Sequence, residues 1–83
     1  MTPKPVIAIV DDDDLARAGT SNLMRSMGYN VQTFSSAEAF LSSDVTNVDC
    51  LISDIQMPGL SGLELQMALR GRAPQLPVIF LTA

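Results

Sequence analysis

Short apolar runs that alternate with helical segments constrain the fold of this chain more than any other feature. The runs are Val6–Val10, Cys50–Ser53 and Val78–Leu81. Runs of this length with no polar face are typical of strands buried on both sides in a parallel sheet. A shorter and more polar strand is expected at 31–34, and its polarity places it near an edge of the sheet.

Helices are expected between these strands. The first is predicted over Leu15–Met27, with Ala16, Leu23, Met24 and Met27 near one face and Gly28 at its end. Two further helices are indicated by Ser-x-x-Glu spacing, which allows a capping box at Ser35 with Glu38 and at Ser61 with Glu64. The last of these helices is expected to stop near Gly71.

The predicted order is therefore β-α-β-α-β-α-β. Such alternation is typical of an α/β fold, with a doubly wound parallel sheet and right-handed crossovers. The chain has 83 residues, of which 47% are hydrophobic, so we expect one small globular domain over residues 1–83 and no second domain. No internal repeat or linker interrupts it.

Charge and composition exclude several classes of function. The net charge of −4 argues against direct nucleic-acid binding by this chain. No apolar run approaches the roughly 18 residues of a membrane span. A single cysteine, Cys50, cannot form an internal disulfide and is most simply a core residue, which fits a cytoplasmic location. Without histidine, a zinc site is improbable, so a bound metal would have oxygen ligands.

Polar residues follow three of the predicted strands. Asp11 and Asp12 follow the first run, Asp54 follows the second, and Thr82 follows the last. Sites in open parallel sheets form at the carboxyl ends of strands, so we expect these side chains to converge. Converging carboxylates repel, and a divalent cation relieves that repulsion. A carboxylate beside such a metal can attack phosphorus, and a hydroxyl can bind a phosphoryl oxygen.

Each of these residues also has a simpler structural explanation. Asp12 or Asp13 could cap the first helix, Asp54 could form the turn before Pro58, and Thr82 could be an ordinary strand residue. The combination of an acidic pair, a lone acid and a hydroxyl after successive strands favours a functional site over these separate roles.

Three segments resemble the receiver domains of response regulators. They are Ile9–Asp13, Ser53–Gly62 and Pro77–Ala83, which resemble the acidic opening, the phosphorylation loop and the fourth strand of that family. The resemblance covers essentially the whole chain. Gly28-Tyr29, Thr33-Phe34, Ser36–Glu38 and Leu63–Gln66 further resemble the FixJ-like subgroup of transcriptional regulators.

The resemblance implies a role for each site residue. Asp54 would accept a phosphoryl group from a histidine kinase, and Thr82 would bind that group as the switch hydroxyl. Asp11, Asp12, Asp54 and the main-chain carbonyl of Gln56 would hold Mg²⁺, with Mn²⁺ as a possible substitute. The chain would then be a phosphoacceptor and not an enzyme, and it would control a DNA-binding output domain elsewhere in the parent protein.

The resemblance also implies the flavodoxin-like strand order 2-1-3-4, with a fifth strand and the last two helices of a receiver missing. The lysine that the fifth strand brings to the site is then absent, since Lys4 is the only lysine and precedes the first strand. The fourth strand would be an open edge, so a homodimer or a higher oligomer is expected for a chain of this length.

Two other functions remain open at this point. One is a magnesium-dependent phosphatase with an aspartyl nucleophile, which needs a second acid two residues later, as Asp11 and Asp13 provide. The other is a structural or dimerisation module without phosphoryl chemistry. Nucleotide binding is disfavoured because no glycine-rich phosphate loop follows the first strand.

Overall fold

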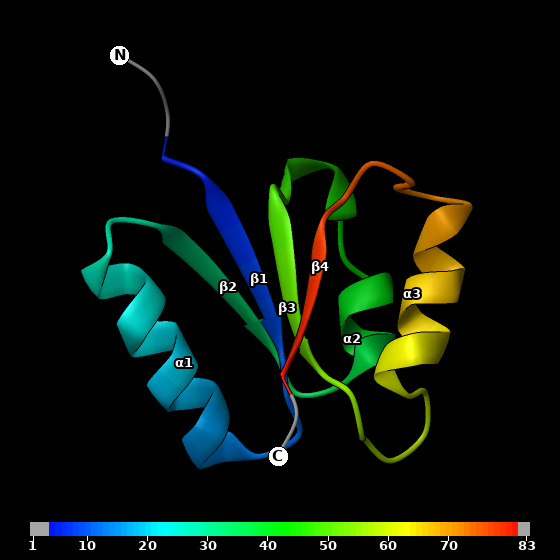
Figure 1. Ribbon diagram of the computed structural model, residues 1–83, viewed down its shortest axis with the longest axis horizontal. Coiled ribbons are helices and arrows are strands. Elements are labelled where there is room, and N and C mark those ends of the chain that lie inside the picture. Colours follow the sequence, from blue (N-terminus) through cyan, green and yellow to red (C-terminus); the bar gives the residue numbers. More distant parts are fainter. Residues whose placement is uncertain (1–3, 82–83) are drawn as a thin grey trace.

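The computed structural model describes residues 4–81, which form a parallel sheet flanked by helices (Figure 1). In chain order the elements are β1 (Val6–Val10), α1 (Asp14–Ser26), β2 (Asn30–Phe34), α2 (Ala37–Leu41), the 3-10 turn η1 (Val45–Asn47), β3 (Cys50–Asp54), α3 (Gly62–Arg70) and β4 (Val78–Leu81). The predicted alternation of strands and helices is thereby confirmed.

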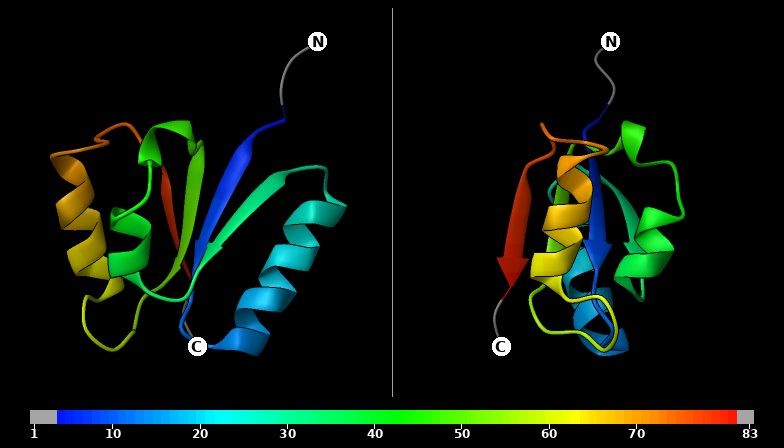
Figure 2. Two further views of the ribbon diagram at one scale, coloured as in Figure 1. Left: turned by 180° about the vertical axis from the view of Figure 1, so that it is seen from behind. Right: turned by 90° about the vertical axis from the view of Figure 1, so that its right-hand side faces the viewer.

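The sheet has the strand order β2-β1-β3-β4, and all its pairings are parallel. The order reverses between β1 and β3, because the chain moves outward to β2 on one side and to β4 on the other. Helix α1 covers one face of the sheet, whereas α2 and α3 cover the opposite face (Figures 1 and 2). This is the doubly wound arrangement expected from the sequence.

Alternate residues of β1 supply the two halves of the core. Ala8 and Val10 point into the larger cluster beneath α2 and α3, which includes Phe40 and Leu65. On the other face, Ile7 and Ile9 join Ile52, and a smaller set of partly buried side chains packs against them. That set is Met24, Tyr29, Val31 and Cys50. The side under α1 is therefore the thinner half of the core.

The buried face of α1 differs from the predicted one. Ser21 is buried and Met24 is partly buried, whereas Ala16, Leu23 and Met27 are exposed. Successive helix residues are turned by about 100°, so Leu23 cannot share the inward line that passes through Ser21 and Met24. The apolar residues of α1 therefore predicted a buried face that is rotated away from the face that contacts the sheet.

The predicted helix ends agree with the structure except at the start of α2, and α3 ends at Gly71 as expected. Ser61 and Glu64 form the predicted capping box at the start of α3, and Gly28 adopts a φ of 93° just after α1. The second helix is capped by Ser36 and not by Ser35, because the Ser36 hydroxyl accepts the Ala39 N–H at 3.0 Å. Prediction of a Ser35–Glu38 capping box was therefore wrong by one residue.

Strand β4 is less buried than its apolar sequence predicted. It pairs with β3 alone among the described strands, and the side chains of Ile79 and Leu81 are 52% and 39% exposed. The prediction of a strand buried on both faces was wrong here, whereas the open edge implied by the resemblance is present in the described chain. None of the described helices combines the length and the apolar character needed to cross a bilayer.

Candidate functional site

The first two acids of the site lie at the carboxyl end of β1. Asp11 directly follows the strand, and its N–H donates to the carbonyl of Phe34 at 3.1 Å, which holds it against the end of β2. Its side chain is only 6% exposed, and Oδ1 accepts the N–H of Asp13 at 2.9 Å. Asp12 is exposed. One carboxylate is therefore fixed by the backbone, while its neighbour is open to solvent.

Asp54 is the last residue of β3, the strand beside β1. The preceding residue, Ser53, is fully buried, and the alternation of the strand turns the Asp54 side chain to the opposite face. The Asp54 Oδ1 atom accepts the N–H of Gln56 at 3.3 Å, which ties the carboxylate to the start of the following loop. A strand end and a loop contact together position this side chain.

The three carboxylates converge as the sequence predicted. Asp11, Asp12 and Asp54 each offer an oxygen, and these oxygens all lie within 4.8 Å of one another. Three negative charges at that separation repel strongly, and a divalent cation relieves the repulsion. Oxygen-only ligands are those that Mg²⁺, Mn²⁺ and Ca²⁺ prefer. The donor set therefore fits a hard cation and does not fit zinc.

The four consecutive aspartates have three different roles. Asp11 and Asp12 belong to the carboxylate cluster. Asp13 instead caps α1, since its Oδ1 accepts the N–H groups of Leu15 and Ala16 at 2.9 and 3.1 Å. Asp14 begins the helix and points to an arginine. The capping role that the sequence left open between Asp12 and Asp13 falls to Asp13 alone.

Arg17 joins the acidic cluster to α1 and was not identified from the sequence. One of its guanidinium nitrogens donates to the main-chain carbonyl of Asp11 at 2.8 Å, and another pairs with Asp14 at 2.5 Å. Its side chain is 20% exposed. The Asp14–Arg17 spacing of i,i+3 is a signal for such a pair on a helix. The contact to Asp11 depends on tertiary structure and has no local signal.

The loop after Asp54 folds back closely onto β3. A Cβ atom on Gly62 would lie 2.7 Å from the carbonyl oxygen of Asp54, so no larger residue fits without a shift. Gly59 has a φ of 75°, which favours glycine, and a Cβ there would meet the carboxylate of Glu38 at 2.7 Å. Both glycines of the motif are thus required by the backbone path of this loop.

Two predicted site features are not tested by the described atoms. Thr82 lies outside the described residues. The Gln56 N–H donates to the Asp54 carboxylate, whereas the atom expected to bind the metal is the Gln56 carbonyl oxygen. Cys50 is partly buried beside the smaller core cluster, and this burial raises the pKa of its thiol, which agrees with the predicted packing role.

The fold and the site together define a class of protein. It is an open, doubly wound α/β protein whose acidic cluster lies at the carboxyl ends of β1 and β3, where the strand order reverses. Residues 7–83 match the response regulator receiver domain family. The chain belongs to that family.

Individual relatives agree with this assignment. The response regulator protein TmoT of Ectopseudomonas mendocina is 47% identical over 79 residues, which are 93% of this chain and 36% of TmoT. The transcriptional regulatory protein FixJ of Bradyrhizobium diazoefficiens is 35% identical over 83 residues, or 99% of this chain and 40% of FixJ. The chain therefore spans little more than a third of the length of these curated relatives.

A solved structure supports the same conclusion. The response regulator protein TrrA of Thermotoga maritima, in complex with Mg²⁺-BeF, superimposes with a TM-score of 0.89 at 34% identity. The match covers 95% of this chain and 70% of the TrrA chain. The receiver fold and the resemblance to two-component regulators that the sequence indicated are thus confirmed.

Proposed function

We propose that this chain receives a phosphoryl group from a histidine kinase on the carboxylate of Asp54. The convergence of Asp11, Asp12 and Asp54 within 4.8 Å carries this proposal. Asp54 is the acceptor because it alone combines a strand end, two acids on the neighbouring strand and the loop that follows. In the transfer, an Asp54 oxygen bonds to phosphorus, the bond from phosphorus to the kinase imidazole nitrogen breaks, and that nitrogen keeps the electron pair.

The acids around Asp54 would hold Mg²⁺, with Mn²⁺ as a substitute. The ligands would be Asp11, Asp12, Asp54 and the main-chain carbonyl of Gln56. When bound, the metal neutralises charge at the site and on the phosphoryl oxygens. The chain itself contributes the positioning: Asp11 is oriented by the Asp13 N–H, and Asp54 is oriented by the Gln56 N–H. The TrrA structure contains Mg²⁺-BeF, in which BeF mimics a phosphoryl group. This complex supports the same chemistry here.

Thr82 would donate a hydrogen bond to a phosphoryl oxygen and thereby report phosphorylation. This role rests on the resemblance and on the position of Thr82 directly after β4, which pairs with β3 as far as Leu81 and Asp54. The phosphoryl group then serves as a signal and is not the product of a turnover reaction, so the chain acts as a phosphoacceptor and not as a general enzyme.

Residues 1–83 would form the N-terminal (βα)3β portion of a receiver domain in a longer cytoplasmic protein. The lengths of TmoT and FixJ support this view, because the chain covers 36% and 40% of them. An output domain that controls transcription is the proposed target of the signal, since FixJ is named a transcriptional regulatory protein. The net charge of −4 supports the view that any DNA contact would belong to that output domain and not to this chain.

The phosphatase alternative is disfavoured by the position of Asp13. That mechanism needs a free acid two residues after Asp11, but the Asp13 carboxylate already accepts two N–H groups at the start of α1. A structural module without phosphoryl chemistry would not account for the convergence of the three carboxylates.

Incubation with acetyl phosphate and Mg²⁺, followed by intact-mass measurement, tests the proposal. We expect one added phosphoryl group on the full-length protein and none on the Asp54→Asn variant. Asp14→Asn is the matched control, because Asp14 lies in the same acidic run but outside the cluster. Persistent labelling of Asp54→Asn would contradict the assignment. Phosphate release with repeated turnover of an unrelated phosphomonoester would favour the phosphatase.

A further inference from the structure

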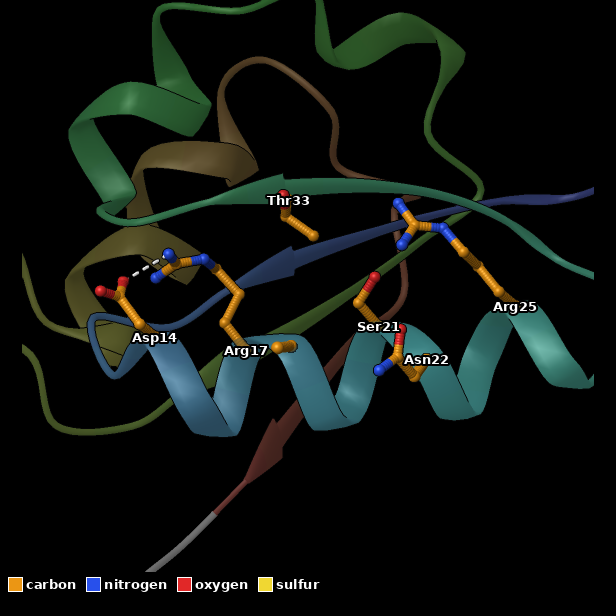
Figure 3. A pocket seen from close by; sticks show the side chains of 7 residues that line it. Asp14, Arg17, Ser21, Asn22, Arg25 and Thr33 are labelled. Carbon is orange, nitrogen blue, oxygen red and sulfur yellow. Dashed lines mark hydrogen bonds and ion pairs between the residues drawn. The ribbon is translucent and has the colours of Figure 1, made fainter.

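A groove between α1 and β2 lies apart from the carboxylate cluster. Its volume is about 220 Å³, and it is lined by Asp14, Arg17, Ala18, Ser21, Asn22, Arg25 and Thr33. Arg17, Ser21 and Arg25 follow one another at four-residue spacing, so they form a line along one side of α1. Figure 3 shows Asp14 and Arg17 together at one end of the groove, Arg25 at the other, and Ser21 between them.

The polar groups of this groove are not all satisfied within the chain. Ser21 is 3% exposed, yet its hydroxyl has no hydrogen-bond partner among the described residues. A buried hydroxyl without a partner is costly, and such groups are uncommon in native proteins. Figure 3 shows this hydroxyl on the side of the helix that faces β2, the side towards which Arg25 extends. The groove thus contains the Ser21 hydroxyl, a buried hydrogen-bond donor without a partner in the described chain, next to the guanidinium group of Arg25.

The charges in the groove leave one unpaired positive group. Arg17 is neutralised by Asp14 and also donates to the Asp11 carbonyl. Arg25 forms no ion pair within residues 4–81. A ligand with a single negative charge would balance Arg25, whereas a dianionic phosphate would leave the groove with a net negative charge. The planar guanidinium also matches a carboxylate, which it can bind through two parallel hydrogen bonds.

We infer that this groove binds a carboxylate, held by the guanidinium of Arg25 and the hydroxyl of Ser21. The volume of about 220 Å³ is below that of a typical drug-sized site, so the ligand is a small carboxylic acid. This site is independent of the proposed phosphoryl transfer, since none of its donors belongs to the carboxylate cluster. A ligand with so few atoms binds with a Kd on the order of millimolar.

Titration with sodium acetate at constant ionic strength, followed by NMR of the ¹⁵N-labelled chain, tests the inference. We expect saturable shifts at the Arg25 side-chain N–H and at the Ser21 and Thr33 amides. Sodium chloride at the same concentrations controls for screening. Shifts that fail to saturate, or that chloride reproduces, would overturn the proposal. Tighter binding of inorganic phosphate than of acetate at these residues would overturn the choice of carboxylate.

Variants separate binding from helix stabilisation. Arg25 lies in the last turn of α1, where any cation stabilises the helix end. Arg25→Lys keeps that charge but loses the planar fork, so it should weaken acetate binding with little change in thermal stability. Ser21→Ala should weaken binding several-fold, and Arg25→Gln about tenfold or more. Arg70→Gln, on α3, is the matched control and should leave acetate binding unchanged. Unaltered binding in Arg25→Gln would contradict the assignment.

Discussion

Gly62 packs directly against the backbone of Asp54. A Cβ atom at position 62 would lie 2.7 Å from the Asp54 carbonyl oxygen and 3.0 Å from both Ile55 Cα and a ring carbon of Phe80. The first turn of α3 thereby holds the residue that we propose as phosphoacceptor. Gly62 also donates its N–H to the Ile55 carbonyl at 3.2 Å, which closes the loop between β3 and α3.

Gly62→Ala should therefore destabilise the chain and move Asp54. Because backbone atoms block the new methyl group, the expected loss in free energy of unfolding is about 1–3 kcal/mol. Gly19→Ala is the matched control, since Gly19 lies in α1 and an added Cβ would meet no atom within 4 Å apart from its neighbours and the backbone of its own helix. That change should stabilise the helix by about 0.5–1 kcal/mol. Urea unfolding of both variants measures the difference, and equal effects would contradict the close packing of Gly62.

Asp12 and Asp13 are neighbours with separable roles. Asp12→Ala should weaken Mg²⁺ binding and leave metal-free stability nearly unchanged, because Asp12 is exposed and belongs to the carboxylate cluster. Asp13→Ala should instead lower the free energy of unfolding by about 0.5–2 kcal/mol, since it removes the N-cap of α1. Calorimetric Mg²⁺ titration and thermal unfolding without metal measure the two effects. If both variants lose metal affinity equally, the division of roles is wrong.

Asp44 should contribute to the acid sensitivity of the fold. Hydrogen bonds from the Thr46 hydroxyl and then from the Thr46 N–H hold the pKa of Asp44 below its usual value of 3.8. The unfolded chain therefore binds a proton at higher pH than the folded chain. The stabilisation is complete above pH 3.8 and is lost as the pH falls through the lower folded-state pKa.

Asp44→Asn tests this pH dependence, because asparagine retains an acceptor oxygen but does not ionise. The difference in melting temperature between the wild type and this variant should be constant at neutral pH and should shrink below pH 3.8. A difference that is the same at all pH values would exclude Asp44 as a source of acid sensitivity.

Strand β4 should promote self-association of the 83-residue chain. Its outer edge has no partner strand among residues 4–81, and its Ile79 side chain is 52% exposed. Ile79→Lys places a charge on that edge and should shift the chain towards monomer in sedimentation equilibrium. Leu15→Lys, at an 86% exposed position on α1, is the control and should change little. A wild-type chain that is monomeric at all concentrations would contradict this prediction.

Much of the fold followed from sequence patterns that are local. The runs at β1, β3 and β4 and the capping box at Ser61 and Glu64 have physical causes within a few residues of themselves. The inward side of α1 could not be predicted from the apolar pattern, because Ser21 is buried there and the side chain of Arg17 is only 20% exposed. Which face of a helix is buried depends on the sheet beneath it.

Part of the candidate site was also predictable, but from the topology of the sheet and not from a local pattern. Asp11, Asp12 and Asp54 converge because parallel strands end at one edge, which is a rule of topology. The hydrogen bond from Arg17 to the Asp11 carbonyl and the packing of Gly62 on Asp54 each join the end of a strand to the helix that follows it. Neither has a signal in residue spacing, so both required the structure.

The identity of the phosphorylated residue tests the central claim most directly. The full-length protein would be treated with acetyl phosphate and Mg²⁺, reduced with borohydride, and digested for peptide mass mapping. Borohydride reduces an aspartyl phosphate to homoserine, so the modified position is recorded in the peptide. The account predicts homoserine at position 54 alone. Homoserine at position 11 or 12, or an unmodified Asp54 in a protein that has gained phosphate, would contradict it.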